Sequence, residues 1–551
     1  MNRILVVLAV LGLALPSLAA SRQRYTIATD GAPHAAALRI ATHGVTDEDG
    51  SPRVRTFRNL NGFAADLTAE EAQALRDTPG VRAVEPVVER WATAVAEPLP
   101  ASNLASYARQ ITPWGLPAIR GAQVWPVTRG AGVNVVVLDS GVDFEHPDLK
   151  AAYAGGHNVI NSSKPPLDDY FHGTHVAGTI AAANNEYGTV GIAPDVKLWS
   201  VKVLDQQGKG YDEQVAAGLD WVMSKQKELG GRWVVNMSFG ASAEGGYLER
   251  EAVARALDQD IILIAATGNT GAGQLDYPAR FTGVIAVGAV DADGNRATFS
   301  AYGGHMALVA PGIDLASTLP TNFREESDIV VGDQIVASLG TIGSPKGSVT
   351  AKIIPCNLGR PGEFPTTVKG NIALIARGDN AFREKSRNAK EAGASAVVIY
   401  DNEPEIGLKP FTLLPRGCPG EDCGADWNDY KFPLTVNVTY EDGQKLLALA
   451  HKQATVAFEF TRYGLSSGTS MAAPHVTSAA ALVLSLDPTL TQSEMLKVLR
   501  NTAHDAGTPG WDHETGWGIV DALAAAQWVA PDKFGVEPPP VQTSRRRSSR
   551  P

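Results

Sequence analysis

Three side chains in this sequence have the chemistry of a nucleophile, a general base and a group that orients the base. Ser470 lies in the run Ser-Gly-Thr-Ser-Met-Ala-Ala-Pro-His, His172 opens the run His-Gly-Thr-His-Val-Ala-Gly-Thr, and Asp139 closes an apolar stretch. A serine hydroxyl attacks a carbonyl carbon when an imidazole takes its proton and a carboxylate holds that imidazole in one tautomer. Each residue alone is typical of a helix cap or a strand end. Because each lies in a glycine-rich motif, the three together favour nucleophilic catalysis.

The surroundings of Ser470 predict that it stands at the start of a helix. A helix N-terminus carries a partial positive charge, which stabilises an oxyanion that develops beside it. Gly468 relaxes the backbone before the helix. Pro474 is expected in the first helical turn, where backbone N–H groups have no partner inside the helix.

The elements that must position these residues follow from the alternation of two patterns. Continuous apolar runs alternate with alanine-rich stretches, which indicates a parallel sheet with helices on both faces. The carboxyl ends of such strands form a crevice for ligands, and Asp139 ends one of them. Strands are expected over 133–138, 198–204, 233–237, 261–266 and 284–290, and helices over 173–183, 211–228, 249–258 and 472–486.

The segments outside this pattern predict further units. Residues 21–104 have a small α+β pattern, and 92–106 are rich in Ala and Pro, as in an exposed linker. The 142 residues of 321–462 are too many for a loop and contain a β-α-β pattern over 371–400, so we expect an inserted domain. Residues 531–551 are predicted to be a flexible basic tail.

Composition excludes some functions and predicts an exported chain. The 551 residues carry a net charge of −11, and 105–530 alone carry −13, so nucleic-acid binding is not expected. Arg3, an apolar run over 4–15 and small residues up to Ala20 predict a secretory signal over 1–20. Because no other run approaches the length of a membrane span, we expect no membrane anchor.

The three cysteines permit at most one internal disulfide bond. Cys356, Cys418 and Cys423 are too few for a disulfide framework, and the sequence contains no Cys-x-x-Cys pair for a zinc site. None of them lies next to a histidine, so we interpret them as structural.

The three motifs resemble the signature blocks of the subtilase family of serine proteases (peptidase S8). They span 137–143, 172–179 and 467–476, and the resemblance continues through shorter blocks between them, covering about 110–320 and 463–530. It implies an α/β fold with a three-layer α/β/α subtilisin-like parallel sheet. The catalytic domain would then be split into 105–320 and 463–530.

The resemblance also assigns roles to matching positions. Ser470 would be the nucleophile, His172 the general base and Asp139 its partner, while the amide of Asn269 would contribute to the oxyanion hole. Two edges would bind the substrate backbone; they contain Ser238, Phe239 and Gly240, and Gly208, Lys209 and Gly210.

Two further sites are implied by the resemblance. Asp276 matches the floor of the primary specificity pocket, where its carboxylate would pair with a substrate Lys or Arg; the alternative is that it points to solvent. Gln110, Asp148 and Asn185 match positions that supply oxygen ligands to a structural Ca²⁺, and the alternative is that they have only structural roles.

The flanking units resemble known accessory domains. Residues 21–104 resemble the inhibitory prosegment of the family, a ferredoxin-like α+β unit; the alternative is a permanent substrate-binding domain. Residues 321–462 resemble a β-rich protease-associated (PA) domain. Many relatives have a cysteine where Asn380 stands, so the usual bridge of that domain is in doubt and Cys418 may pair with Cys423 instead.

These inferences predict a secreted serine endopeptidase that hydrolyses peptide bonds through an acyl-enzyme on Ser470. Its partners would be polypeptide substrates and its own prosegment. Two alternatives stay open on the same fold. One is a catalytically silent binding protein, and the other is an acyl transferase or ligase that passes the acyl group to an amine instead of water.

Overall fold

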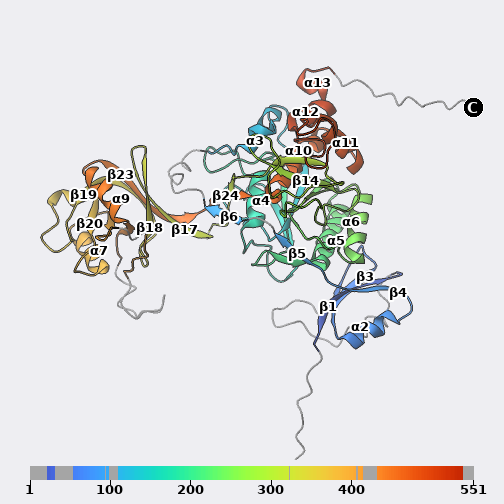
Figure 1. The fold of residues 1–551 in the computed structure, drawn as a ribbon, viewed down its shortest axis with the longest axis horizontal. Coiled ribbons are helices and arrows are strands. Elements are labelled where there is room, and N and C mark those ends of the chain that lie inside the picture. Colours follow the sequence, from blue (N-terminus) through green and yellow to red (C-terminus); the bar gives the residue numbers. More distant parts are fainter. Residues whose placement is uncertain are drawn as a thin grey trace, which may run out of the picture.

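A computed structural model of the chain describes residues 21–31, 54–92, 95–98, 110–321, 323–404, 408–413 and 431–537. The predicted signal over 1–20, Cys418, Cys423 and the tail beyond 537 lie outside these residues. Figure 1 shows a central α/β body with a small sheet packed on one side and a barrel at the end of two long strands.

The central sheet has seven parallel strands in the order β15-β14-β13-β11-β7-β9-β8. All residues of the interior strand β7 are buried, as expected for a parallel sheet covered on both faces. The strands are β7 (Val133–Asp139), β8 (Tyr153–Asn158), β9 (Lys197–Lys202), β11 (Arg232–Met237), β13 (Ile262–Ala266), β14 (Ile285–Val290) and β15 (Leu308–Pro311).

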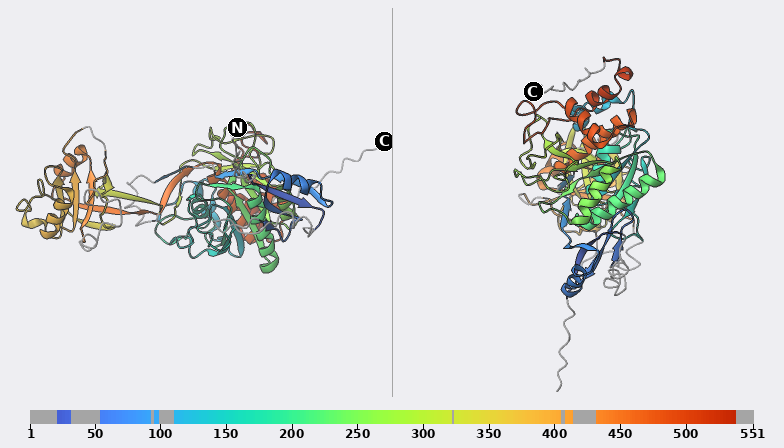
Figure 2. Two further views of the ribbon diagram at one scale, coloured as in Figure 1. Left: turned by 90° about the horizontal axis from the view of Figure 1, so that it is seen from below. Right: turned by 90° about the vertical axis from the view of Figure 1, so that its right-hand side faces the viewer.

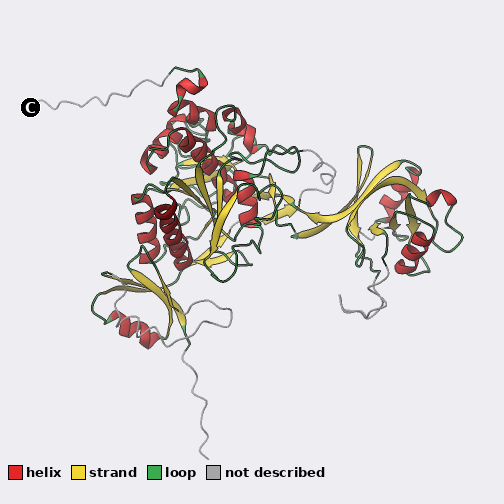
Figure 3. Cartoon of the chain, turned by 180° about the vertical axis from the view of Figure 1, so that it is seen from behind, coloured by secondary structure: helices red, strands yellow, loops and turns green. Residues whose placement is uncertain are grey.

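Helices cover both faces of this sheet, and alternate residues of β7 point into two separate cores. Val135 and Val137 pack against the helices of one face, whereas Val136 and Leu138 pack against those of the other. The first face carries α4 (His172–Ala181), α10 (Thr469–Leu486), α11 (Gln492–Thr502) and α12 (Ala522–Val529), and the second carries α5 (Asp212–Leu229) and α6 (Tyr247–Asp258). Figure 3 shows this three-layer arrangement from behind, which confirms the predicted fold class.

The helix α10 runs through the centre of the first face. Among the described residues it is the one helix long and apolar enough to cross a membrane, but 89% of it is buried inside the protein. Its apolar character is therefore accounted for by the core. Short helical turns, α3 (Gly115–Ala118), η2 (Gly121–Val124) and α13 (Pro531–Phe534), complete the catalytic body.

Within its described residues, the N-terminal unit is a small antiparallel sheet with one helix. Its strands have the order β2-β3-β1-β4, and its own core contains Ile27, Phe63 and Leu75. Figure 2 shows this unit beneath α5 and α6, with which Leu60 and Ala64 share a core. The elements are β1 (Gln23–Thr29), β2 (Val54–Thr56), β3 (Gly62–Leu67), α2 (Ala69–Arg76) and β4 (Val81–Pro86).

In the part of the insert that the structure describes, a closed seven-stranded barrel is accompanied by two α-helices. Strands β17 and β23 pair with each other over most of their lengths and lead from the catalytic body to the barrel. The predicted β-α-β pattern over 371–400 corresponds to β20, α7 and β21, and Cys356 is buried with a free thiol. The elements are β17 (Arg324–Val331), β18 (Gln334–Gly340), β19 (Gly347–Pro355), η3 (Thr366–Val368), β20 (Ile372–Ala376), α7 (Phe382–Glu391), β21 (Ala396–Tyr400), β22 (Leu434–Val438), α9 (Tyr440–Ala448) and β23 (Gln453–Thr461).

Two small sheets join the N-terminal unit to the catalytic body. In the first, β5 (Glu89–Ala92) lies between β10 (Lys209–Tyr211) and β12 (Phe239–Gly240). In the second, β6 (Val95–Pro98) pairs with β24 (Tyr463–Ser467), which also pairs with β16 (Leu315–Thr318).

Within the segment 92–106, which was predicted to be an exposed linker, residues 95–98 form the strand β6. The composition of that segment is rich in Ala and Pro and has no strand periodicity of its own. The edge of β24 nevertheless offers unpaired backbone groups, and these hold residues 95–98 in extended form. Pro98 is tolerated because it lies at the last position of this edge strand.

Candidate active site

The residues predicted to form a triad come from three elements that meet at the carboxyl end of the central sheet. Asp139 ends β7, His172 begins α4 and Ser470 is the second residue of α10, which packs against α4. His172 Nδ1 lies 2.8 Å from Asp139 Oδ1, and both side chains are fully buried. The backbone N–H of Ser140 donates to the same carboxylate oxygen at 2.7 Å.

The start of α4 is held in a strained conformation. Phe171, the residue before His172, has a φ of 130°, which an L-residue rarely adopts. Such strain is found where the surrounding structure fixes a functional residue. Here the phenyl ring packs on Tyr170 and Phe323, with ring centroids 4.6 and 5.2 Å away.

The side chains of Ser470 and His172 are not hydrogen-bonded to each other in this structure. The Ser470 hydroxyl donates to the carbonyl oxygen of Ser238 at 2.8 Å. His172 Nε2 is buried and meets no hydrogen-bond partner within the described part of the chain. A rotation of the Ser470 hydroxyl toward this nitrogen is therefore needed before proton transfer, and catalytic hydrogen bonds are often long or absent without substrate.

Pro474 does not lie in the first turn of its helix, which corrects the sequence prediction. Because α10 begins at Thr469 rather than at 472, Pro474 lies in the second turn and cannot donate to the carbonyl of Ser470. That carbonyl instead accepts the hydroxyl of Ser238 at 2.8 Å, and Asn236 donates to the Ser238 hydroxyl at 2.8 Å. The carbonyl left free by the missing helix bond thus anchors the backbone of Ser470 to the segment before β12.

The amide of Asn269 is held in one orientation beside Ser470. Its Oδ1 accepts both the backbone N–H and the hydroxyl of Thr469, each at 2.9 Å. Because a backbone N–H can only donate, the oxygen of this amide must face Thr469. The amide nitrogen is therefore the end that can donate to an oxyanion, next to the backbone N–H of Ser470.

The two predicted substrate-binding edges flank one slot, which β5 occupies. On one side Lys209 pairs with Trp91 and Gly210 with Arg90, and on the other Phe239 pairs with Ala92. The Ala92 N–H also donates to the carbonyl of Gly208 at 2.8 Å, and Gly240 pairs with Trp91. Ser238, by contrast, directs its side chain into the catalytic body.

Asp276 lies behind this slot, and its side chain is only 5% exposed. It fills space left by two glycines: a Cβ on Gly268 would lie 2.2 Å from its Oδ2, and one on Gly240 would lie 2.8 Å from its Cβ. Burial raises the pKa of Asp276, and the charge of Arg90 opposes that change.

The three predicted calcium ligands meet in one hydrogen-bonded cluster. Asn185 donates to Asp148 Oδ1 at 2.9 Å, and Gln110 donates to the carbonyl of Ala183 at 2.9 Å. The other Asp148 oxygen accepts from the Thr189 N–H at 3.1 Å and the Tyr463 hydroxyl at 2.9 Å. A cation fits this set only after the Asn185 amide turns its oxygen toward Asp148.

Clusters of acidic, histidine or cysteine side chains are a second kind of metal site. Across the ranges that the structure describes, no group of three or more His, Cys, Asp or Glu side chains is arranged to hold a metal ion. The Asp148 cluster, with one carboxylate plus amide and carbonyl oxygens, is a set that suits a hard cation such as Ca²⁺.

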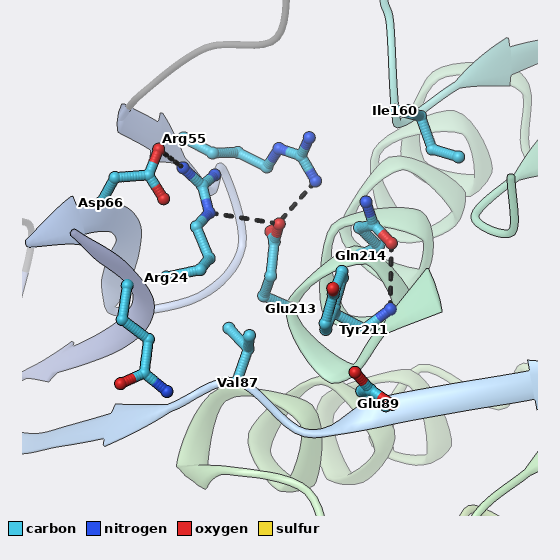
Figure 4. A pocket seen from close by; sticks show the side chains of 10 residues that line it. Arg24, Arg55, Asp66, Val87, Glu89, Ile160, Tyr211, Glu213 and Gln214 are labelled. Atoms are coloured by element: carbon cyan, nitrogen blue, oxygen red, sulfur yellow. Dashed lines mark hydrogen bonds and ion pairs between the residues drawn. The ribbon is translucent and has the colours of Figure 1, made fainter. Parts of the chain in front are cut away.

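Three ion pairs between the N-terminal unit and the catalytic body, made to two buried glutamates, were not foreseen from the sequence. Arg90 of β5 and Glu249 of α6 form a fully buried pair at 2.5 Å. Figure 4 shows Arg24 and Arg55 pointing at Glu213 near the start of α5, at 3.4 and 3.0 Å. No sequence signal links such partners, because more than 150 residues separate Arg90 from Glu249 and Arg55 from Glu213.

Comparison with known families agrees with this architecture. Residues 130–332 and 430–518 match the subtilase family, residues 346–446 match the PA domain and residues 19–90 match the peptidase inhibitor I9 family. Together with the triad geometry and the fold, these matches define the class of protein. The chain belongs to the subtilase family of serine endopeptidases.

Individual proteins that resemble the chain are named as alkaline proteases and subtilisins. The chain is 39% identical over 272 residues to a thermostable alkaline protease of Halalkalibacterium halodurans, covering 49% of this chain and 68% of that protein. It is 42% identical over 213 residues to subtilisin Savinase of Lederbergia lenta, covering 38% of this chain and 76% of that protein.

Solved structures extend the likeness beyond the catalytic body. A psychrophilic subtilisin-like protease, Apa1 of Pseudoalteromonas sp. AS-11, matches with a TM-score of 0.50 and 28% identity, covering 77% of this chain and 99% of that one. Fervidolysin of Fervidobacterium pennivorans matches with a TM-score of 0.56 and 21% identity, covering 93% of this chain and 62% of that one, which supports the fold alone.

Proposed function

We propose that this chain is the inhibited precursor of a secreted endopeptidase whose acyl-enzyme forms on Ser470. The observation that carries the proposal is the position of β5. A peptide strand already runs between β10 and β12, and the buried pair of His172 and Asp139 meets Ser470 at one end of that slot. A substrate bound as an added strand would use the same backbone hydrogen bonds.

The geometry supports one sequence of proton transfers. His172 Nε2 takes the Ser470 proton as Oγ attacks the substrate carbonyl, while Asp139 stabilises the resulting imidazolium through Nδ1–H. The Asn269 amide and the Ser470 N–H donate to the oxyanion. His172 then gives its proton to the leaving amine, and a water molecule, deprotonated by the same imidazole, releases the acyl group.

We further propose that the N-terminal unit inhibits the enzyme until it is removed. Its strand β5 occupies the substrate slot and pairs Arg90 with Glu249 of α6, and its body binds α5 through the ion pairs at Glu213. The match to the peptidase inhibitor family supports this role. The predicted signal over 1–20 supports export.

Labelling with a fluorophosphonate probe tests the nucleophile. We expect the processed protein to be labelled, and mass spectrometry of its peptides to find the label on Ser470. Denatured protein is the control, because an unactivated serine does not react. A processed, folded protein that takes no label would favour the silent-binder alternative, and transfer of the acyl group to an added amine in preference to water would favour the ligase alternative.

A structural calcium ion at the Asp148 cluster is part of the proposal. Subtilases commonly bind such an ion, and Asp148, Asn185 and Gln110 lie together here. Calcium at 100 times its Kd should add about 2.7 kcal/mol to the free energy of unfolding. We therefore expect calcium, but not magnesium, to raise the Tm of a Ser470→Ala protein, and Asp148→Asn to abolish that rise. An equal Tm in calcium and in a chelator would contradict the site.

Asp276 is proposed to select a basic residue on the acyl side of the cleaved bond. Its buried carboxylate borders Gly240 and Gly268 at the slot and would form a charge-assisted hydrogen bond with Lys or Arg. We expect a peptide library to show this preference, and Asp276→Asn to reduce it about tenfold or more. Because burial raises the pKa of Asp276, the preference should weaken as the pH falls through that pKa. A preference for apolar residues would rule out this role.

A further inference from the structure

One charged side chain of β5 is completely buried in the catalytic body. Arg90 is 0% exposed, whereas its strand neighbours Glu89 and Trp91 are exposed. Its Nε lies 3.1 Å from Glu249 Oε1 and its Nη2 lies 2.5 Å from Glu249 Oε2. Nη1 donates to the carbonyls of Glu89 and Ala243 at 3.1 and 3.2 Å. The guanidinium thus has specific partners on the side of the enzyme.

The pocket that surrounds this guanidinium, here called the arginine pocket, is acidic and depends on a glycine for its shape. Burial opposes the charged form of Arg90, but the carboxylate of Glu249, together with the charges of Asp212 and Asp276, raises the pKa of Arg90 above its ordinary value. A Cβ on Gly245 would lie 1.6 Å from Glu249 Oε2 and 2.7 Å from Arg90 Nη2. Any larger residue at 245 would therefore displace the pair.

Glu249 depends on whatever fills the arginine pocket. Its side chain is 0% exposed, and among the described residues every hydrogen bond to its carboxylate comes from Arg90. Burial raises the pKa of Glu249 to about 7, even though Arg90 lowers it. A buried carboxylate that loses its cation is strongly destabilised. Once β5 leaves the slot, Glu249 faces the space that Arg90 filled, and a substrate guanidinium entering that space can form the same two hydrogen bonds.

The register of β5 gives the position of the arginine pocket along a substrate. Ala92 pairs with Phe239, and the preceding enzyme residue is Ser238, whose carbonyl accepts the Ser470 hydroxyl at 2.8 Å. In an extended antiparallel peptide, the residue opposite Ser238 is therefore the one whose carbonyl faces the nucleophile. The place of Arg90 is three residues before it.

We propose that Glu249 makes this enzyme select polypeptides with an arginine at the fourth residue before the cleaved bond. The inference rests on the proposed endopeptidase function and names the substrate class that its slot takes: extended segments with a guanidinium at that place. Arginine suits the pocket better than lysine, because the planar guanidinium bonds both carboxylate oxygens at once. The competing role, in which Glu249 serves only to bind the N-terminal unit, is decided by the experiment.

The experiment uses the processed wild-type enzyme and three peptides that differ only at the fourth residue before the cleaved bond. These peptides carry arginine, citrulline or alanine there. Citrulline has nearly the shape of arginine without its charge. We expect kcat/KM for the arginine peptide to exceed that for the citrulline peptide about 30-fold or more. Equal values for the two peptides would overturn the proposal. Cleavage of any of the three peptides reports the endopeptidase activity itself, so failure to cleave all three would count against the proposed function instead.

Two variants separate substrate selection from binding of the N-terminal unit. Glu249→Gln should bring the ratio of arginine to citrulline close to one. Asp220→Asn is the matched control, because Asp220 accepts the N–H groups of Arg58 and Asn59 at 2.8 and 2.6 Å and does not contact β5. This control should keep the wild-type ratio. If Glu249→Gln does not fold, the wild-type peptide series alone still decides the question. A wild-type ratio in a folded Glu249→Gln enzyme would contradict the role of Glu249.

Discussion

Replacing Ser470 by alanine should lower kcat about 10⁶-fold, the size of the loss that the corresponding change causes in subtilisin. The variant should also accumulate as the full-length chain, because the triad that would cut the N-terminal unit is inactive. The fold should persist, since the change deletes one hydroxyl and its hydrogen bond to the carbonyl of Ser238. The activity is measured after a trace of wild-type enzyme has processed the variant and has then been inactivated with a fluorophosphonate.

A second serine in the same helix provides the control for this loss. Ser478 is also buried in α10, and its hydroxyl donates to a backbone carbonyl, that of Pro474, at 2.7 Å. Ser478→Ala therefore removes a comparable hydrogen bond without touching the triad. It should be processed and active. Comparable loss of activity in both variants would mean that Ser470 acts through the helix and not as the nucleophile.

Asp139→Asn should lower kcat about 10⁴-fold with little change in KM. The Asp139 carboxylate lies 2.8 Å from His172 Nδ1 and is fully buried, so its charge is poorly screened when the imidazolium forms. A neutral amide of the same shape cannot supply that charge. The prediction is checked by steady-state kinetics on a peptide that the wild-type enzyme cleaves.

Another buried carboxylate near the triad tests whether this effect is specific. Asp143 is 4% exposed and accepts hydrogen bonds from the backbone N–H groups of Glu145 and Thr321, but makes none to His172. Asp143→Asn should lower the Tm while leaving kcat within about tenfold of wild type. If Asp143→Asn lost as much activity as Asp139→Asn, the special role of the Asp139 charge would be wrong.

The central body could be predicted from the sequence because its strands and helices have strong patterns of their own. β7 is a continuous apolar run, and the start of α4 lies in a motif of small residues. The edge strand β8 was missed, because Tyr-Ala-Gly-Gly-His-Asn has neither an apolar run nor alternation. Its place is determined by pairing with β9 rather than by the propensity of its residues.

The contacts between distant segments could not be predicted in the same way. Glu249 lies near the start of a helix, where an acidic residue is ordinarily a solvated one that interacts with the helix dipole. Only the fold brings Arg90 to it and buries both. The hydrogen bond from Ser238 to the Ser470 carbonyl could not be predicted either. The sequence shows the proline that leaves this carbonyl without its helical partner, but it does not show that Ser238 replaces that partner.

The pairing of β16 with β24 brings together the two points at which the insert is joined to the catalytic body. Thr318 pairs with Tyr463, and the Leu319 N–H donates to the Arg462 carbonyl at 2.7 Å, so the chain leaves and re-enters the catalytic body at adjacent points. To that body, the 142 residues of 321–462 are equivalent to a hairpin loop. Closing a flexible loop of that length costs only about 2 kcal/mol more than closing one of ten residues. The barrel can therefore be exchanged for a short turn with little change in the chain entropy of the enzyme.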